Sequence, residues 1–391
     1  MREDVAIVGA GPAGARAAYV LASRGARVTI FDASHPREKP CGGGVTGRAM
    51  ALVADAVAPN SLRHTAIRNV RFTGLRTGGA PARQAGVDDA VVPIGFDALV
   101  VADRATFDAA LLAAAERAGA VLERSRVTNV SAGAHGATIE TTRGRHHADF
   151  LVGADGANSL VRRRVAAAFR RDQLSIATGF YAHGVTSDEI AIELTVDPPG
   201  YLWSFPRPSH LAIGICAQAD AGVTAASLRA GTRQWIDAAG VAAGARLEAY
   251  SWPIPSLAVS DFGALTLAGP RWAVVGDAAG LVDPITREGI YFAIASGQWI
   301  ADALGAGGAG RAYAARVRDE AAPELARAAR FKAGFFRPAF TGLMLRALRQ
   351  SEAIRSVMAD LVAGRQSYLT LKRRLLGTLE VSLAWRMLMN D

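Results

Sequence analysis

The chain has 391 residues, of which 50% are hydrophobic and 20% are charged, with a formal net charge of +9. This composition predicts a globular protein with one large or two modest cores and argues against a disordered chain. The two cysteines, Cys41 and Cys216, lie far apart and form no CxxC pair, so we expect neither a disulfide framework nor a bound metal.

The N-terminus shows no targeting signal. The opening MREDVAIVGAG enters an apolar strand by Val5, which leaves no room for the regions of a signal peptide. The longest apolar stretches are broken by polar residues before they reach the roughly 20 residues of a membrane-spanning helix. We therefore predict a cytoplasmic protein without a transmembrane segment.

The positive charge is concentrated near the C-terminus. From Arg311 onward there are 15 Lys and Arg residues against seven Asp and Glu residues, interspersed with large apolar side chains. This pattern favours peripheral contact with an anionic membrane surface or binding of a phosphorylated ligand. Solvated arginine faces on helices that cover a core would explain it equally well. Nucleic acid is an unlikely partner because no recognition motif accompanies the charge.

The first element is a dinucleotide-binding unit. Residues 5–8 form an apolar strand run, and the sequence GAGPAG follows it. In this motif Gly9 permits a tight turn, Gly11 lets the backbone approach a pyrophosphate, and Gly14 allows close packing of helix on strand. The free N–H groups of the helix start would face the phosphates. The predicted contacts are Gly9, Gly11, Pro12, Ala13 and Gly14.

The second strand ends in an acidic residue. The helix is expected to stop near Gly25, and RVTIFD then forms a strand that ends at Asp32. A carboxylate at this position accepts hydrogen bonds from ribose hydroxyls and repels a 2′-phosphate. The ligand should therefore be FAD or NAD rather than NADP.

Two later stretches decide between these cofactors. Residues 150–163, FLVGADGANSLVRR, carry a strand into Asp155, and residues 272–294, WAVVGDAAGLVDPITREGIYFAI, carry a strand into Gly276 and Asp277. With the opening motif, they resemble the three fingerprints of the FAD-dependent hydroxylase and reductase superfamily, which is p-hydroxybenzoate hydroxylase-like. Taken singly, each stretch could be an ordinary turn.

This resemblance implies FAD and further contacts with it. Asp277 would bind the ribityl hydroxyls, and the N–H groups of a helix start near Gly289 would face flavin O2 and stabilise the reduced flavin. Arg104 would enter the cofactor site, although it could instead be a surface ion-pair partner. The additional predicted cofactor contacts are Val127, Asp155, Gly276, Pro284 and Ile290.

The stretch KPCGGGVTGRAM, residues 39–50, exposes bare backbone beside Cys41. In this superfamily the chain after the second strand passes over the flavin, so Gly42, Gly43 and Gly44 would make room for the flat ring. A plain flexible loop is the alternative. Cys41 is a candidate catalytic residue that tunes the flavin or shields the reacting alkene, or else a small buried hydrophobe. No proton donor can be assigned.

The chain also resembles one family within the superfamily. The CGG stretch, PPGYLWSFPRPSHLAIGI at 198–215, VDPITREGIYFAI at 282–294 and GRQSYLTLKRRLL near the C-terminus are similar to geranylgeranyl reductases. Tyr201, Trp203 and Phe205 alternate along a predicted strand and should share one face. The resemblance implies that they wall the substrate pocket, whereas an ordinary sheet core would have the same pattern.

The predicted fold is α/β, with a Rossmann-type FAD-binding domain built from discontinuous segments. Alternating stretches such as EIAIELTV predict a mainly antiparallel β substrate domain. A helical C-terminal region follows. The expected boundaries are 1–60, 98–165 and 270–310 for the FAD-binding domain, 61–97 and 166–269 for the substrate domain, and 311–391 for the helical region.

The resemblance implies an FAD-dependent oxidoreductase that reduces isolated C=C bonds of an isoprenoid chain of the geranylgeranyl type by hydride from flavin N5. We recognise no second strand-turn-helix GxGxxG unit for a resident nicotinamide, so the electrons should come from transiently bound NAD(P)H or from a reduced carrier protein. Two alternatives remain: an FAD-dependent monooxygenase that hydroxylates or epoxidises a hydrophobic small molecule, and a non-catalytic flavin or lipid carrier.

Overall fold

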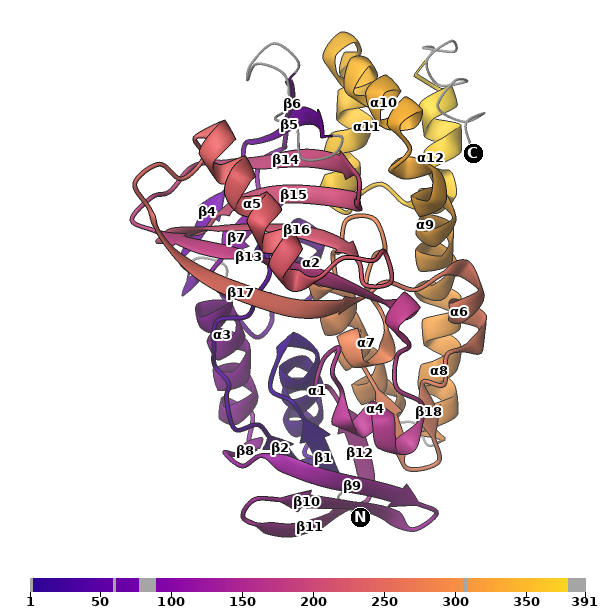
Figure 1. Cartoon of the computed structure of the whole chain (residues 1–391). Helices are drawn as coiled ribbons and strands as arrows, with labels where there is room; N and C mark the ends of the chain where they lie inside the picture. Colours follow the sequence, from indigo (N-terminus) through magenta and orange to yellow (C-terminus); the bar gives the residue numbers. More distant parts are fainter. Residues whose placement is uncertain (1–2, 59–60, 77–88, 305–307, 379–391) are drawn as a thin grey trace.

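The first strand of the chain lies inside a six-stranded sheet (Figure 1). The computed structural model describes residues 3–58, 61–76, 89–304 and 308–378. The sheet order is β18-β19-β12-β1-β2-β8, and all neighbours are parallel except β18 and β19. The strands are β1 (Asp4–Val8), β2 (Arg27–Phe31), β8 (Val121–Glu123), β12 (Phe150–Gly153), β18 (Ala268–Gly269) and β19 (Trp272–Val274).

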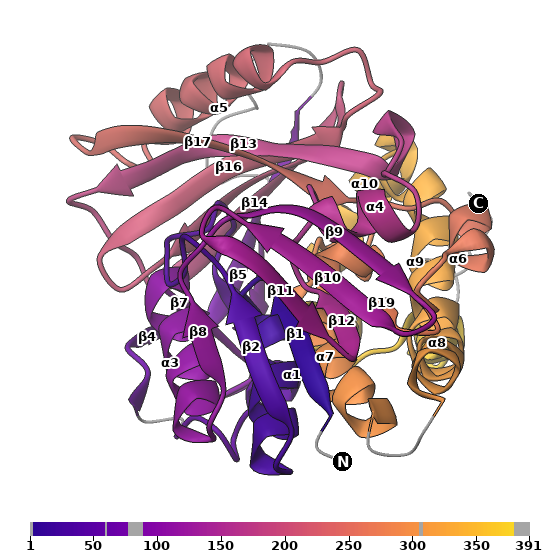
Figure 2. The ribbon, with the colours of Figure 1, turned by 90° about the horizontal axis from the view of Figure 1, so that it is seen from below.

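Both faces of this sheet are covered, which is why its strands read as continuous apolar runs. Helices α1 (Pro12–Ser23), α3 (Arg104–Arg117) and α7 (Ile290–Leu304) pack together on one side. An antiparallel sheet covers the other side, and Figure 2 shows it in front of β1 and β12. Its strands are β9 (Val127–Gly133), β10 (Gly136–Thr141) and β11 (Gly144–Ala148).

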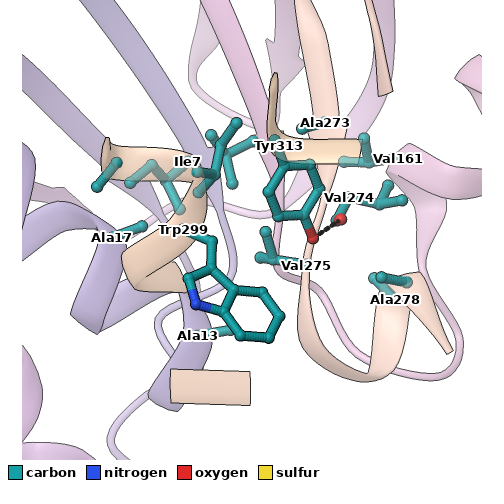
Figure 3. Close-up of a cluster of buried hydrophobic side chains, with 14 of the residues drawn as sticks. Ile7, Ala13, Ala17, Val161, Ala273, Val274, Val275, Ala278, Trp299 and Tyr313 are labelled. Atoms are coloured by element: carbon teal, nitrogen blue, oxygen red, sulfur yellow. Dashed lines mark hydrogen bonds between the residues drawn. The ribbon is translucent and has the colours of Figure 1, made fainter. Parts of the chain in front are cut away.

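The core between the sheet and its helices combines small and large side chains (Figure 3). Ala13 and Ala17 of α1 permit close approach of α7, where a Cβ added to Gly297 would lie 2.3 Å from the carbonyl oxygen of Ala13. Tyr313 is fully buried and donates its hydroxyl to the carbonyl oxygen of Val274 at 2.8 Å. This bond ties α8 (Ala309–Glu320) to the end of β19.

A second sheet of seven strands has the order β17-β13-β16-β15-β14-β5-β6. Its neighbours are antiparallel except the parallel pair β14 and β5, so the predicted mainly antiparallel sheet is confirmed. Helix α5 (Ala225–Ala239) covers one face, as Figure 2 shows. The strands are β5 (Asn69–Arg76), β6 (Ala90–Pro93), β13 (Leu174–His183), β14 (Glu189–Val196), β15 (Pro199–Pro206), β16 (His210–Gln218) and β17 (Arg246–Pro255).

A small sheet of order β3-β7-β4 connects the glycine-rich stretch to α3. Strand β3 (Gly44–Thr46) begins within that stretch and pairs with β7 (Leu99–Ala102), two residues before α3. Strand β4 (His64–Ala66) lies on the other side of β7, and the short helix α2 (Gly47–Ala51) follows β3. The glycine loop is thus anchored at its C-terminal end by a strand pair.

The C-terminal part is helical, as predicted. Helices α10 and α11 cover β5 and β6 at the edge of the seven-stranded sheet (Figure 1). Residues 379–391 of the predicted helical region lie outside the described residues. The helices are α9 (Ala322–Phe335), α10 (Pro338–Gln350), α11 (Glu352–Val362) and α12 (Tyr368–Leu376), and shorter ones elsewhere are α4 (Leu160–Val165), α6 (Val259–Ala264), η2 (Arg171–Gln173) and η3 (Gly276–Ala279).

The α/β fold class is confirmed by this arrangement. Within the described ranges, no helix is both long enough and apolar enough to cross a membrane. The domain boundaries given above stay a prediction.

Candidate active site

Two cavities meet between the six-stranded and seven-stranded sheets. The first, called here the glycine-rich cavity, has a volume of about 350 Å³ and borders Gly9, Gly11 and Asp32. The second, called the aromatic cavity, has a volume of about 240 Å³ and borders the CGGG loop and the aromatic residues of β15. Pro12, Lys39, Arg104, Trp252, Asp277 and Ala293 line both, so the two cavities adjoin one another.

The glycine turn leaves the space that a pyrophosphate needs. Gly9 has φ +103°, and a Cβ there would lie 2.3 Å from the carbonyl oxygen of Ala154. At Gly14 a Cβ would lie 2.0 Å from the carbonyl oxygen of Gly9, so this glycine permits helix and strand to pack. At Gly11 the nearest atom would be His35 Nε2 at 3.8 Å, so the space in front of α1 is open.

Asp32 lies at the end of β2 within a network of donors. Its carboxylate accepts the N–H of Ala10 at 2.9 Å and of Ser34 at 2.8 Å, and His35 Nδ1 lies 2.7 Å from Oδ2. Burial acts to raise the pKa of Asp32, but the hydrogen bond from His35 and the amides outweigh it and hold the pKa well below its usual range. Asp32 is therefore an anion at neutral pH.

Arg104 is buried rather than exposed at the surface. Its guanidinium forms a bidentate pair with Asp108, at 2.9 and 2.8 Å, and its Nη1 lies 3.5 Å from Cys41 Sγ. His35 Nε2 lies 3.3 Å from the same Asp108 carboxylate. A chain of polar contacts therefore runs from Asp32 in the glycine-rich cavity to Cys41 in the aromatic cavity.

The CGGG loop is held by Arg207, which the sequence analysis did not single out. Arg207 is fully buried just after β15 and donates to the carbonyl oxygens of Cys41 at 2.5 Å and Gly42 at 3.4 Å. It also pairs with Glu38. Burial lowers the pKa of Arg207 to about 10, which still leaves the guanidinium charged at neutral pH. Cys41 and all three glycines line the aromatic cavity.

The aromatic residues of β15 share one face, as their alternation predicted. Tyr201, Trp203 and Phe205 all line the aromatic cavity, and the ring centroids of Tyr201 and Trp203 are 5.7 Å apart. The intervening Leu202 belongs to the core under α5 on the opposite face. The hydroxyl of Tyr201 donates to the carbonyl oxygen of Thr286 at 2.8 Å, which fixes the ring beside the loop that precedes α7.

Apolar side chains from distant segments complete the aromatic cavity. They come from two neighbouring strands of the seven-stranded sheet and from two C-terminal helices, which no local pattern in the sequence pairs with one another. They are Val70, Phe72, Ile190, Ile192 and Leu194 from β5 and β14, and Phe335, Met358, Leu361 and Val362 from α9 and α11.

The start of α7 borders the same cavity. Gly289 and Ile290 line it, and Asp277 is paired there with Lys39 Nζ at 2.9 Å. Glu288 caps α7 by accepting the N–H of Tyr291 at 2.7 Å. Burial raises the pKa of Glu288, while an ion pair with Arg48 at 3.1 Å and the Tyr291 amide oppose this shift.

The predicted site residues thus lie together, with a few in supporting positions. Val127 and Asp155 line the glycine-rich cavity, although the Asp155 carboxylate also caps α4 by accepting the N–H of Leu160 at 2.6 Å. Gly14, Gly276 and Pro284 border neither cavity. Lys39, His35, Trp252, Arg207 and Glu288 border or support the site without having been predicted. All of them except Trp252 lie in or beside the quoted motifs, and that position was their only signal in the sequence.

Two polar atoms in the wall lack partners. Thr46 Oγ1 and Trp252 Nε1 are buried without a hydrogen bond to any described residue, and both residues line the aromatic cavity. Buried polar atoms are nearly always paired, so these atoms suit a flat ligand with polar edges. With the open space at Gly11 and the anionic Asp32, the two cavities fit the two halves of FAD.

Comparisons with known proteins agree with this fit. The model of the FAD binding domain family matches residues 2–319. A chloroplastic geranylgeranyl diphosphate reductase of Oryza sativa subsp. japonica is 29% identical over 334 residues, covering 79% of this chain and 67% of that protein. A menaquinone reductase of Mycolicibacterium smegmatis is 31% identical over 335 residues, covering 78% and 77%. A digeranylgeranylglycerophospholipid reductase of Methanothrix thermoacetophila is 28% identical over 375 residues, covering 86% and 88%.

Solved structures share the fold. A geranylgeranyl bacteriochlorophyll reductase-like protein of Thermoplasma acidophilum superimposes with a TM-score of 0.76 at 21% identity, over 96% of this chain and 99% of that one. A flavin-dependent brominase gives a TM-score of 0.72 at 20% identity, over 98% and 100%. At these identities the superpositions describe the fold alone. The family match makes FAD the cofactor.

Proposed function

Because this chain belongs to the FAD binding domain family and to its geranylgeranyl reductase-like group, as an FAD-dependent oxidoreductase, we propose that it reduces isolated C=C bonds of an isoprenoid chain. The single observation that carries the proposal is that the glycine-rich cavity, which fits the phosphate half of FAD, adjoins a mainly apolar cavity. The relatives named above are reductases of geranylgeranyl, menaquinone and digeranylgeranyl compounds, which supports an isoprenoid substrate for this chain.

The composition of the aromatic cavity suits a branched hydrocarbon chain. Most of its walls are aliphatic and aromatic side chains from the seven-stranded sheet and the C-terminal helices, and its charged lining residues are Lys39, Arg104, Asp277, Arg287 and Glu288. An apolar ligand gains about 25 cal/mol for each Å² of surface that it buries in such a site. A cavity of this kind also excludes water from the reacting carbons.

In the proposed arrangement, Gly9, Gly11 and the start of α1 bind the pyrophosphate, Asp32 binds the ribose, and Asp277 binds the ribityl chain. Bound FAD would supply the hydride that saturates the double bond. The N–H groups at Gly289 and Ile290 stand at the start of a 15-residue helix, where the helix dipole favours negative charge.

The side chains around the CGGG loop position the substrate. Tyr201, Trp203 and Phe205 form the wall that orients the isoprenoid chain and excludes water. Cys41 lies in the same wall with Arg104 Nη1 at 3.5 Å and Arg207 Nη2 at 3.8 Å from its sulfur. We propose that Cys41 contacts the reacting alkene, with both arginines holding its orientation.

The proposed electron donor is transiently bound NAD(P)H or a reduced carrier protein. The GxGxxG turn that follows β1 is taken up by the FAD site. The same spacing recurs at 42–47, in the CGGG loop, and at 305–310, after α7, but in neither place does it follow a strand as a dinucleotide-binding unit requires. A resident nicotinamide site is therefore not part of the proposal.

The proposed place of action is the cytoplasmic side of a membrane. On α12, Leu369 and Leu376 are exposed at 56% and 39%, and Lys372 and Arg373 lie between them. An exposed apolar and basic surface of this kind binds anionic lipid, with about 1 kcal/mol for each basic residue. Vesicle co-sedimentation should show binding to anionic but not neutral vesicles, and the double variant Lys372→Glu and Arg373→Glu should abolish it.

Anaerobic reoxidation of the reduced enzyme tests the proposed reaction. Enzyme reduced with dithionite and freed of excess reductant should regain its oxidised flavin absorbance when geranylgeranyl diphosphate or a menaquinone is added, because the alkene takes up the electrons. A flavin that stays reduced with every prenyl compound and reoxidises only with oxygen would contradict the proposal and favour the monooxygenase.

A further inference from the structure

The loop before α7 holds an arginine in an unusual backbone conformation. Arg287 has φ +61°, and Asp97 is the other residue apart from glycine with positive φ in the described part of the chain. The loop is closed by backbone bonds from Arg287 to Asp283 at 3.0 Å and from Asp283 to Glu288 at 2.9 Å. A side chain in the left-handed region costs free energy, and such strain gathers at functional sites.

Arg287 is also the unbalanced charge of the aromatic cavity. The charged residues that line the cavity are Lys39, Arg104, Asp277, Arg287 and Glu288. Four of them are paired: Lys39 with Asp277, Arg104 with Asp108, and Glu288 with Arg48. Arg287 makes no ion pair with any residue that the structure describes.

The guanidinium of Arg287 donates a hydrogen bond from one of its two edges only. Its Nη1 donates to the hydroxyl of Ser256 at 2.5 Å. Its Nε is buried without a hydrogen-bond partner. The bond from Nη1 is the one side-chain hydrogen bond of Arg287 to the described residues, so Nη2 is not used. Nε and Nη2 form the edge with which arginine binds two oxygens of one phosphate or carboxylate group.

A second cation reinforces this charge from behind the wall. Lys332 of α9 donates to the same Ser256 hydroxyl at 2.7 Å and to Gln218 Oε1 at 2.6 Å. Among the described residues it too has no ion pair. Burial and the charge of Arg287 lower the pKa of Lys332 to about 7. Cys216 and Asp220 act against this shift, but no carboxylate of the described residues forms an ion pair with either cation. Two half-buried cations that share one hydroxyl are costly unless an anion joins them.

We propose that Arg287, supported by Lys332 through Ser256, binds a phosphoryl group at the head of the substrate while the apolar walls hold its hydrocarbon chain. This inference rests on the proposed function and narrows it to substrates with an anionic head. Uncharged prenyl alcohols and quinones should bind less tightly because they leave the Arg287 edge unpaired.

Binding to the oxidised, FAD-loaded enzyme tests the inference without turnover. Calorimetric titration should show geranylgeranyl diphosphate binding at least about tenfold more tightly than geranylgeraniol. Arg287→Met should remove this preference and leave the affinity for the alcohol unchanged. Arg287→Gly suits the positive φ, so it keeps the fold and should have the same effect. Arg233→Met, at an exposed position of α5, is the charge-matched control and should keep the preference.

Other outcomes would overturn the inference. Equal affinity of the unaltered enzyme for the diphosphate and the alcohol would contradict a site for the substrate's head group. If inorganic pyrophosphate bound in that case, the two cations would form a site for free phosphate instead. A preference that survives in both Arg287 variants, with a changed flavin midpoint potential, would mean that Arg287 neutralises reduced flavin instead. Turnover is measured separately, so an enzyme that binds the diphosphate as expected but reduces no alkene would contradict the proposed function and not this site.

Discussion

The ring of Phe205 lies directly against the backbone of Gly42. A Cβ built on Gly42 would lie 2.8 Å from ring atoms of Phe205, closer than real Cβ contacts allow. A Cβ on Gly44 would lie 3.1 Å from the same ring. The glycines therefore let β15 pack on the loop, in addition to the predicted clearance for a flat cofactor. The CGGG loop and the aromatic wall form one unit.

Gly42→Ala should therefore displace Phe205 and disturb the loop that borders the cofactor. We expect lower FAD occupancy and turnover reduced by at least about tenfold, equivalent to roughly 1.4 kcal/mol of barrier. The double variant Gly42→Ala and Phe205→Leu should recover part of this loss because leucine can move away from the new methyl group. Flavin content and steady-state turnover are measured for the single and the double variant. No recovery in the double variant would mean that the Phe205 contact is not the reason for glycine here.

Asp32→Ala should weaken FAD binding. The substitution removes the anion that is proposed to bind the ribose, so we expect the FAD dissociation constant to rise at least about tenfold. Fluorescence titration of the apoenzyme with FAD measures this directly. Asp4→Ala, at the start of β1 and in an exposed ion pair with Arg27, is the control that should leave the affinity unchanged.

Trp203→Ala should alter the handling of substrate and leave FAD in place. Trp203 is 4% exposed and lines the aromatic cavity, so its removal widens the slot for the isoprenoid chain. We expect a higher KM and a mixture of products reduced at different double bonds. Trp235→Phe, on the buried side of α5 against the opposite face of the sheet, controls for lost stability and should keep the product pattern. An unchanged pattern in Trp203→Ala would remove Trp203 from the substrate wall.

Lys332 should make stability depend on pH. Its pKa is lowered from 10.5 to about 7 by burial and by Arg287, while Cys216 and Asp220 oppose the shift. Between these values the unfolded chain binds more protons than the folded one, so the free energy of unfolding should rise with pH, by at most about 1.4 kcal/mol per pH unit. Below pH 7 Lys332 is charged in both states, so the full destabilisation from burying its charge is present.

Urea denaturation from pH 6 to 10 measures this slope. Lys332→Met should flatten the rise above pH 7, because methionine keeps the chain length without the charge. Lys372→Met, at an exposed position of α12, should leave the slope unchanged. An unaltered slope in Lys332→Met would show that the lysine keeps an ordinary pKa in the folded protein.

The sequence motifs predicted those parts of the site that are formed by local backbone geometry. Gly9, Gly11 and Asp32 belong to one strand-turn-helix-strand unit, so their spacing alone brings them together. The alternation of Tyr201 and Trp203 likewise fixes a shared face. These are short-range relationships, and the structure brings the residues to the two cavities as the motifs indicated.

The parts that sequence reasoning missed depend on contacts between distant segments. Arg207 reaches Cys41 across 166 residues, and Lys332 meets Ser256 across 76 residues. Nothing near Lys332 in the sequence distinguishes it from the solvated basic residues of the C-terminal helices. Only the fold brings α9 to the ends of β16 and β17, where Lys332 is half-buried and bonds to Gln218 and Ser256.

The most direct test of isoprenoid reduction is mass spectrometry of the product. Reduced, FAD-loaded enzyme is incubated anaerobically with geranylgeranyl diphosphate, and the product is compared with that of a parallel reaction under air. We expect the product to gain two hydrogens for each double bond reduced and to gain no oxygen. Any product formed under air should be reduced at the same double bonds. Unchanged substrate under anaerobic conditions together with addition of an oxygen atom under air would contradict isoprenoid reduction.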